Sequence, residues 1–148
     1  MKIYSKPSLT VDNIIRKNST ILLIKRSKEP FKNHYALPGG FINFDETVED
    51  AVRRETLEET SLDVEPLDIL GVYSDPSRDP RGHAISIVFM STIIDGIPKA
   101  GDDAKEIAWI NINDLHKIDM AFDHCTILSD YLKWLYNKET FWSSKYRR

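Results

Sequence analysis

Residues 40–62 read GFINFDETVEDAVRRETLEETSL and contain the most informative pattern in the chain. From Thr47 to about Thr60 the pattern is helical, and Thr47 with Asp50 three residues later resembles a capping box. At about 100° per residue, Glu55 and Glu59 lie on the same side of the helix as the apolar residues of its first turns. The core-facing side of this helix therefore changes from apolar to acidic along its length.

The acidic end of the helix carries Glu55, Glu58 and Glu59, at spacings where like charges repel. Arg54 can pair with Glu58 four residues later, but one arginine cannot neutralise three carboxylates. A divalent cation can, and carboxylate oxygens are hard ligands that suit Mg²⁺ or Mn²⁺. The pattern therefore favours a metal site, and the alternative is a glutamate-rich helix whose carboxylates simply face water.

This stretch resembles the Nudix box, a highly specific motif. The resemblance rests on Gly40, on Glu46 after five intervening residues, and on the run 54–62 after seven more. Two positions depart from the pattern: Thr56 stands where an aliphatic residue is usual, and Ser61 replaces the glycine that normally ends the helix. A non-glycine residue at positive φ costs about 1 kcal/mol, so the second departure affects the helix exit. Neither departure removes a metal ligand.

The resemblance implies an α+β protein with the Nudix fold, in which a mixed β-sheet is sandwiched between α-helices. It also implies that the box holds divalent cations, either Mg²⁺ or Mn²⁺, and that Arg54 orients the glutamates while Glu46 holds the loop. The implied metal ligands are Gly40 through its carbonyl group, Glu55, Glu58 and Glu59. The implied reaction is hydrolysis of a nucleoside diphosphate linked to another group, by water attacking a phosphorus.

The rest of the chain alternates between strand patterns and loops. The sequence predicts strands over 9–16, 21–24, 67–73, 84–94 and 106–110, with 84–94 central and 106–110 last. A second helix is expected from His124 to about Lys138. Strands outnumber helices and the helices come singly, which is typical of an α+β sheet with helices on its faces.

A second polar segment, residues 74–83, reads SDPSRDPRGH and lies between two expected strands. Its arginines would suit a phosphate or ribose because a guanidinium offers paired donors, and the alternative is a surface turn with self-neutralising charges. The segment resembles one of the ADP-ribose pyrophosphatase-like branch of the family, as does 121–124. The residues expected to bind substrate are Arg26, Arg78, Arg81 and His83, with Phe31 and Phe122 as candidates to stack on a base.

Glu106 stands where many family members carry an extra metal ligand or base. Asp102 and Asp103 compete for that role, and an exposed acidic loop is the alternative. The residues alone do not identify the general base. The catalytic candidates are Glu58, Glu55, Arg54 and Glu106.

The 148 residues suit one domain over 1–148, with the box at 40–62 and a C-terminal helix and basic, aromatic tail at 124–148. The formal net charge of −3 argues against a protein that binds nucleic acid through its whole surface. No apolar run approaches the roughly 18 residues of a membrane span. The tail is expected to pack against its own domain or a second subunit, and Nudix proteins are frequently dimers, so we expect a homodimer.

The only cysteine, Cys125, cannot form an internal disulfide, and the first six residues contain no apolar leader segment. Both features indicate a reducing, cytoplasmic setting. Cys125 is expected to be a small buried residue of the second helix.

Taken together, these features predict a Mg²⁺- or Mn²⁺-dependent Nudix pyrophosphohydrolase. Its first-choice substrate is ADP-ribose, with AMP and ribose 5-phosphate as products. One alternative shares the chemistry: a sanitising hydrolase for 8-oxo-dGTP or another non-standard nucleoside triphosphate. A second alternative is a non-catalytic Nudix domain that binds a nucleotide sugar and regulates a partner, against which the three intact box glutamates argue.

Overall fold

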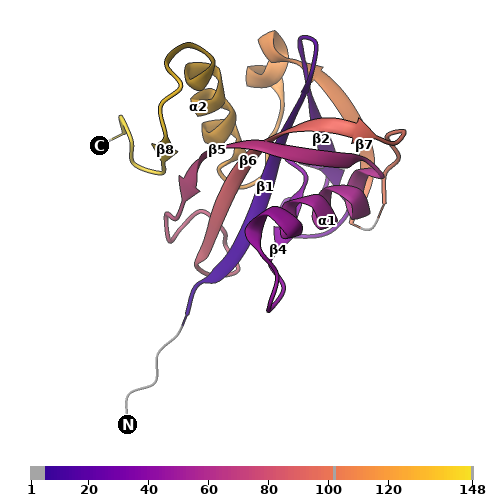
Figure 1. Cartoon of the computed structure of the whole chain (residues 1–148). Helices are drawn as coiled ribbons and strands as arrows, with labels where there is room; N and C mark the ends of the chain where they lie inside the picture. The colour runs from indigo at the N-terminus through magenta and orange to yellow at the C-terminus, as the bar shows by residue number, and fades with distance from the viewer. Residues whose placement is uncertain (1–5, 102, 148) are drawn as a thin grey trace.

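Strand β1 (Ser8–Lys17) and strand β6 (Ala84–Asp95) run parallel through the middle of the sheet (Figure 1). The computed structural model describes residues 6–101 and 103–147. Both strands contain many β-branched residues, whose stiff side chains favour extended backbone. Because these strands are buried between neighbours, they form the frame on which the other elements are placed.

The other strands extend this frame to both sides. The order across the sheet is β3-β2-β1-β6-β5-β8, with β4 paired to β1 and β7 paired to β2. The bounds are Thr20–Arg26 for β2, Tyr35–Ala36 for β3, Gly39–Phe41 for β4, Asp63–Tyr73 for β5, Ala104–Asn111 for β7 and Phe141–Trp142 for β8. The β1–β6 and β5–β8 pairs are parallel and the other pairs are antiparallel. The sheet is mixed, as expected.

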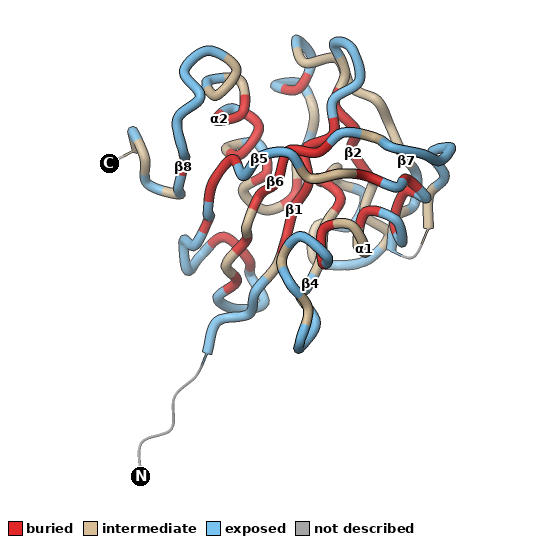
Figure 2. The backbone as a smooth tube through the Cα atoms, in the orientation of Figure 1, coloured by how far each residue is buried: buried red, intermediate tan, exposed pale blue. Residues whose placement is uncertain are grey.

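Two helices cover the sheet, and successive side chains of β1 alternate between them. Val11 packs with buried residues of helix α1 (Val48–Thr60), whereas Ile14 packs with buried residues of helix α2 (His124–Asn137). A short 3₁₀ helix, η1 (Ile112–Lys117), follows β7. Figure 2 shows buried backbone where the central strands pass between the two helices. The α+β arrangement with helices on both faces is therefore confirmed.

Helix α1 begins and ends as its sequence predicts. The side-chain oxygen of Thr47 accepts a hydrogen bond from the backbone N–H of Asp50 at 3.1 Å, which caps the first turn. Ser61 closes the helix with a left-handed φ of 63°, and its N–H donates to the carbonyl oxygen of Leu57 at 2.9 Å. A serine thus occupies the backbone geometry that glycine adopts at lower cost.

The unusual threonine of the box faces a polar residue of the sheet. The side-chain amide of Asn13 donates to the hydroxyl oxygen of Thr56 at 2.9 Å, and both residues are fully buried. The hydroxyl group of Thr60 donates to the carbonyl oxygen of Thr56 at 2.6 Å. The threonine that replaces an aliphatic residue is therefore matched by a partner on β1.

Most expected elements are confirmed, with three differences. The strand expected from 67 begins at Asp63, and β7 is not the last strand because β8 follows the second helix. Cys125 is exposed, so the expectation that it is buried was wrong. Helix α2 buries the side that carries Ile127 and Leu128, and position 125 lies on its outer side.

None of the described helices has the length and apolarity that a membrane crossing requires. Three parts of the sequence interpretation lie outside the described residues: the start of the chain at 1–5, the acidic candidate Asp102, and Arg148 of the basic tail.

Replacing Ser61 with glycine tests the strain at the end of α1. We expect Ser61→Gly to raise the free energy of unfolding by about 0.5–1 kcal/mol, because relief of the left-handed strain exceeds the added entropy of the unfolded chain. In urea the midpoint should rise at an unchanged m value. The control is Ser144→Gly, at an exposed serine whose φ is not positive. Equal losses of stability in both variants would contradict the interpretation.

Candidate active site

Two adjacent glycines bring the β4 loop against the acidic end of α1. A Cβ at Gly40 would lie 2.5 Å from the carboxylate carbon of Glu55, and a Cβ at Gly39 would lie 2.1 Å from the carbonyl oxygen of Val11. At Gly39 the obstacle is the backbone of β1, so only glycine fits there, whereas at Gly40 it is the flexible end of the Glu55 side chain, which a Cβ would push aside. The loop backbone therefore lies directly against the Glu55 carboxylate.

Arg54 gathers the acidic groups of the box around one guanidinium. It donates to both carboxylate oxygens of Glu46, at 2.6 and 2.9 Å. Its Nη1 donates to Glu55 at 2.8 Å and to Glu58 at 3.3 Å, and its Nη2 donates to the carbonyl oxygen of Phe41 at 3.0 Å. The hydrogen bonds to Glu46, followed by those to Glu55, raise the pKa of Arg54, which stays charged. One side chain thus ties the loop to two of the three glutamates.

The three glutamates differ in their surroundings. Glu59 is only 6% exposed, and its Oε1 accepts a hydrogen bond from the backbone N–H of Gly39 at 2.7 Å. Burial raises the pKa of Glu59 well above its ordinary value, against the effect of that hydrogen bond. Burial also raises the pKa of Glu55, which Arg54 opposes, whereas Glu58 is exposed. The ionised form of the two inner carboxylates therefore needs further positive charge nearby.

The box carboxylates offer the oxygen donors that a divalent cation takes, but their side chains are not gathered around one point in this structure. Within residues 6–101 and 103–147, no three His, Cys, Asp or Glu side chains stand in an arrangement that could hold a metal ion. Glu55 is turned toward Arg54, and Glu59 is turned toward the N–H of Gly39. In both residues the second carboxylate oxygen makes no hydrogen bond to the described part of the chain. Hard oxygen donors whose pKa values are raised by burial fit a divalent cation at this place in chemical type.

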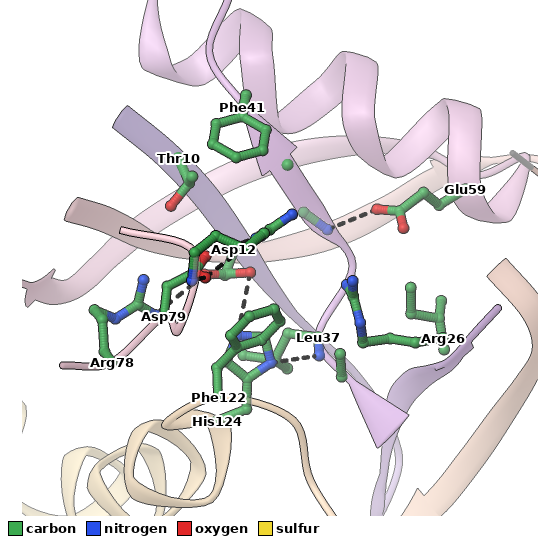
Figure 3. Close-up of a pocket in the computed structure, with 15 residues that line it drawn as sticks. Thr10, Asp12, Arg26, Leu37, Phe41, Glu59, Arg78, Asp79, Phe122 and His124 are labelled. Atoms are coloured by element: carbon green, nitrogen blue, oxygen red, sulfur yellow. Dashed lines mark hydrogen bonds and ion pairs between the residues drawn. The ribbon is translucent and has the colours of Figure 1, made fainter. Parts of the chain in front are cut away.

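A pocket opens beside Glu59, between the strands β1 and β2, the glycine loop and the segment before α2 (Figure 3). Each wall comes from a different part of the sequence. The expected substrate residues among its lining are Arg26, Arg78, Arg81 and Phe122, and the lining also includes Gly40 and Glu59. The structure thus brings the inner glutamate together with three arginines and an aromatic ring.

Two of these arginines lie over the ring of Phe122. The guanidinium of Arg26 is 5.0 Å from the ring centroid and that of Arg81 is 5.7 Å from it. Arg81 also lies 5.5 Å from the ring centroid of Phe41 and pairs with Asp79 at 2.8 Å. Burial, and then the positive charge of Arg81, lower the pKa of Arg26. The pocket wall therefore holds two guanidinium groups over one aromatic ring, and that of Arg81 is paired with Asp79.

Arg78 is part of the pocket wall, but its guanidinium is occupied. It donates to both carboxylate oxygens of Asp123, at 2.9 and 2.7 Å, and its side chain is only 4% exposed. This two-pronged ion pair ties the 74–83 segment to the residue before α2. Arg78 therefore supports the wall, in place of the direct phosphate clamp expected from its position.

Six expected site residues do not line this pocket: Arg54, Glu55 and Glu58 of the box, and also His83, Glu106 and Phe31. The Nε2 atom of His83 lies 2.8 Å from a backbone carbonyl oxygen of its own loop. Glu106 is exposed and accepts a hydrogen bond from the hydroxyl group of Tyr35 at 3.0 Å. Phe31 packs edge-on against Phe122, with 5.0 Å between ring centroids. Phe31 supports the pocket's aromatic residue, and Glu106 lies outside the group of box carboxylates.

A buried polar group on the α2 side of β1 was not found from the sequence. Asp12 accepts a hydrogen bond from the hydroxyl group of Ser86 at 2.5 Å and lies 3.5 Å from Nε2 of His124. The Nδ1 atom of His124 accepts from the backbone N–H of Leu37 at 3.0 Å, so a neutral imidazole carries its proton on Nε2, toward Asp12 (Figure 3). The available signal was a carboxylate inside the run 11–15, between the apolar residues Val11, Ile14 and Ile15.

Comparison with known proteins identifies the family. A family model described as the NUDIX domain matches residues 6–134. The chain belongs to the Nudix family. Nudix hydrolases generally depend on divalent metals, and the donor set described above fits that requirement.

Two curated Nudix relatives differ in what their names say. A protein of Methanocaldococcus jannaschii named ADP-ribose pyrophosphatase is 54% identical over 133 residues, which cover 90% of this chain and 78% of that protein. The ADPR responsive transcriptional repressor NtrR of Acinetobacter baylyi is 30% identical over 93% of this chain, and the match covers 58% of the repressor. The family therefore contains both an enzyme and a regulator similar to this chain.

Solved structures agree with the fold. The NUDIX domain of Shewanella oneidensis NrtR, crystallised with ADP ribose, has a TM-score of 0.78 at 25% identity and covers 89% of this chain and 90% of that one. A bifunctional NMN adenylyltransferase/ADP ribose pyrophosphatase of Francisella tularensis, complexed with AMP and a manganese ion, has a TM-score of 0.75 at 33% identity. It covers 88% of this chain and 42% of that one.

The ion pair between Glu46 and Arg54 makes a prediction about stability and pH. Hydrogen bonds from Arg54 and from the backbone N–H of Asn43 lower the pKa of Glu46 to about 2, from an ordinary value of 4.5. A lowered carboxylate pKa stabilises the fold above pH 4.5, and this stabilisation is lost as the pH falls toward 2. The midpoint of thermal unfolding of Glu46→Gln should therefore lie below that of the wild type at pH 7, and the gap should narrow in acid.

The matched control is Glu49→Gln, because Glu49 lies at the exposed start of α1 and forms no ion pair within the described residues. At pH 7 its unfolding midpoint should lie closer to that of the wild type than the midpoint of Glu46→Gln does, because the exchange removes no ion pair from the described part of the chain. A gap for Glu46→Gln that does not change with pH would contradict the assignment.

Proposed function

We propose that this Nudix hydrolase cleaves ADP-ribose to AMP and ribose 5-phosphate, with Mg²⁺ or Mn²⁺ held by Glu55, Glu58, Glu59 and the carbonyl group of Gly40. The observation that carries the proposal is the group of box glutamates that Arg54 draws together beside a pocket containing cationic side chains. In the reaction, water adds to one phosphorus and the bridging P–O bond breaks, so each product keeps one phosphate.

The choice of ADP-ribose rests on two independent supports. The relative with 54% identity over 90% of this chain is named ADP-ribose pyrophosphatase. The pocket offers two arginines for negative charge and the ring of Phe122 for a base or sugar face. A diphosphate with a nucleoside on one side and a sugar on the other matches these groups.

A divalent cation held by the box residues named above would supply positive charge for the diphosphate and Lewis acidity for the attacking water. The chain's own residues prepare that site. Arg54 keeps Glu55 and Glu58 on one side of α1, and the N–H of Gly39 fixes the buried Glu59. Glu58, as the exposed member, is the candidate that accepts the proton of the attacking water, with Glu55 as the second candidate.

Two further candidates share the fold. The similarity to an ADP-ribose-responsive repressor favours a regulatory, non-catalytic domain as the alternative of another class. A hydrolase for 8-oxo-dGTP or other non-standard triphosphates is the alternative with the same chemistry. The homodimer, the cytoplasmic setting and the absence of nucleic-acid and membrane partners stay predictions from the sequence.

A substrate panel separates these candidates. We expect the protein with Mg²⁺ or Mn²⁺ to release AMP and ribose 5-phosphate from ADP-ribose faster than it converts NADH, a diadenosine polyphosphate or 8-oxo-dGTP. Chromatography of the phosphate-bearing products measures each reaction. If ADP-ribose stays intact while another compound is consumed, the substrate is wrong and the reaction class stands. If nothing is converted in either metal, the regulatory alternative is favoured.

The variant Glu59→Gln tests whether the box glutamates are catalytic. Loss of the inner ligand charge should lower kcat for ADP-ribose by about 100-fold or more, because the cations lose a carboxylate at the reacting diphosphate. Calorimetry with ADP-ribose should find binding nearly unchanged, since the pocket arginines remain. Glu49→Gln, on the exposed side of the same helix, is the control and should keep full turnover. A Glu59→Gln protein with wild-type kcat would refute the assignment.

A further inference from the structure

The C-terminal residues 141–147, which we call the strap, lie beyond the part of the chain that the family model matches. The strap begins with β8, which pairs in parallel with β5 through Gly71 and Val72 (Figure 1). The side chain of Phe141 is buried in the core cluster that contains α2. A Cβ at Gly71 would lie 2.0 Å from the carbonyl oxygen of Phe141, so this close approach requires glycine. The strap is thus packed onto its own chain at the end of β5.

Ser143 of the strap holds the first residues of the 74–83 segment. Its hydroxyl oxygen accepts hydrogen bonds from the backbone N–H groups of Ser74 and Asp75, at 2.9 and 3.1 Å. These are the first two residues after β5 ends at Tyr73. Within the described residues, no neighbouring strand accepts hydrogen bonds from these N–H groups, so Ser143 satisfies them as an N-cap residue satisfies the first N–H groups of a helix.

Arg147 fastens the strap where β5 ends. Its two Nη atoms donate to both carboxylate oxygens of Asp130 in α2, at 2.9 and 2.7 Å, and its Nε donates to the carbonyl oxygen of Ser143 at 3.1 Å. The same carboxylate accepts the hydroxyl group of Tyr73 at 2.8 Å, and its side chain is fully buried. The last residue of β5 and the strap therefore share one buried anion.

The segment that the strap holds leads directly to the candidate active site. Four residues beyond Ser74, Arg78 forms its two-pronged pair with Asp123, and Phe122 and His124 on either side of Asp123 line the pocket. Behind the segment lies a cavity of about 340 Å³, between the strap and the start of α2. The segment is not packed against core on that side, so its position depends on its hydrogen bonds to Ser143 of the strap and on the Arg78–Asp123 pair.

We propose that Ser143 and Arg147 are positioning residues for substrate binding, because the strap sets the 74–83 segment and thereby the pocket wall formed by Arg78, Arg81 and Phe122. The inference rests on the proposed function only for the identity of the substrate. The contacts between the strap and the 74–83 segment do not depend on it. Neither residue reaches the pocket, so both act through the segment. Loosening the segment weakens ground-state and transition-state binding alike, which raises KM and leaves kcat in place.

The test compares Ser143→Ala with Ser144→Ala in the full-length protein. Ser144 is the matched control because it is the next residue of the strap and its side chain makes no hydrogen bond to the described residues. With ADP-ribose and Mg²⁺, Ser143→Ala should raise KM about threefold to tenfold and keep kcat within about twofold. Ser143→Thr keeps the hydroxyl group and should restore the wild-type KM.

Amide hydrogen exchange provides a readout that needs no substrate. The N–H groups of Ser74 and Asp75 should exchange faster in Ser143→Ala than in the wild type or in Ser144→Ala, at an unchanged midpoint of thermal unfolding. If the wild type does not convert ADP-ribose, the proposed function fails and the exchange rates still decide whether the strap holds the segment.

Three results would overturn the strap proposal. One is equal exchange of Ser74 and Asp75 in both alanine variants. Another is a KM of Ser143→Ala no higher than that of Ser144→Ala in an enzyme that converts ADP-ribose. The third is a loss of kcat and of thermal stability in Ser143→Ala that threonine does not repair, since that pattern marks a purely structural residue.

Discussion

The guanidinium of Arg54 is the interaction on which the candidate active site depends. Without it, Glu46, Glu55 and Glu58 would present negative charges to one another across one loop and one helix turn. With it, five hydrogen bonds between 2.6 and 3.3 Å join the loop carbonyl group and three carboxylates to a single cation. The planar fork of arginine suits this task because its donors are fixed relative to one another. Arg54 thus offsets the mutual repulsion of the carboxylates of the loop and of α1.

Successive side chains of β1 point to opposite faces of the sheet, so one strand contacts both the box helix on one face and the pocket wall on the other. Side chains that face α1 make the apolar contact that seats the box helix, as Val11 does. Asp12, one residue later, faces α2 and meets His124. A strand that carries both kinds of residue in turn therefore connects the carboxylate helix with the pocket wall. The glycine pair in β4 completes this connection, because it lets a neighbouring backbone lie flat against β1 and the Glu55 carboxylate.

The local structure of the box could be predicted because it depends on interactions between residues that are close together in the sequence. The helix of the box, its threonine cap and the left-handed position of Ser61 follow from periodicity and backbone sterics within 15 residues or so. The pairing of Arg78 with Asp123 could not be predicted, because those residues are far apart in sequence and only the fold opposes them. The same holds for Asp12 with His124. Cys125 shows an error of another kind. Its residue type suggested a buried position, but it lies on the outer side of α2 and is exposed.

The buried contact between Asn13 and Thr56 links two positions that belong to different elements. A valine at position 56 alone would leave the asparagine amide without its acceptor in a dry interior, at a cost of one to three kcal/mol or so. An apolar residue at both positions would remove donor and acceptor together at little cost. During divergence, these two sites should consequently change in concert, and intermediates with a single exchange should be the least stable members of the lineage.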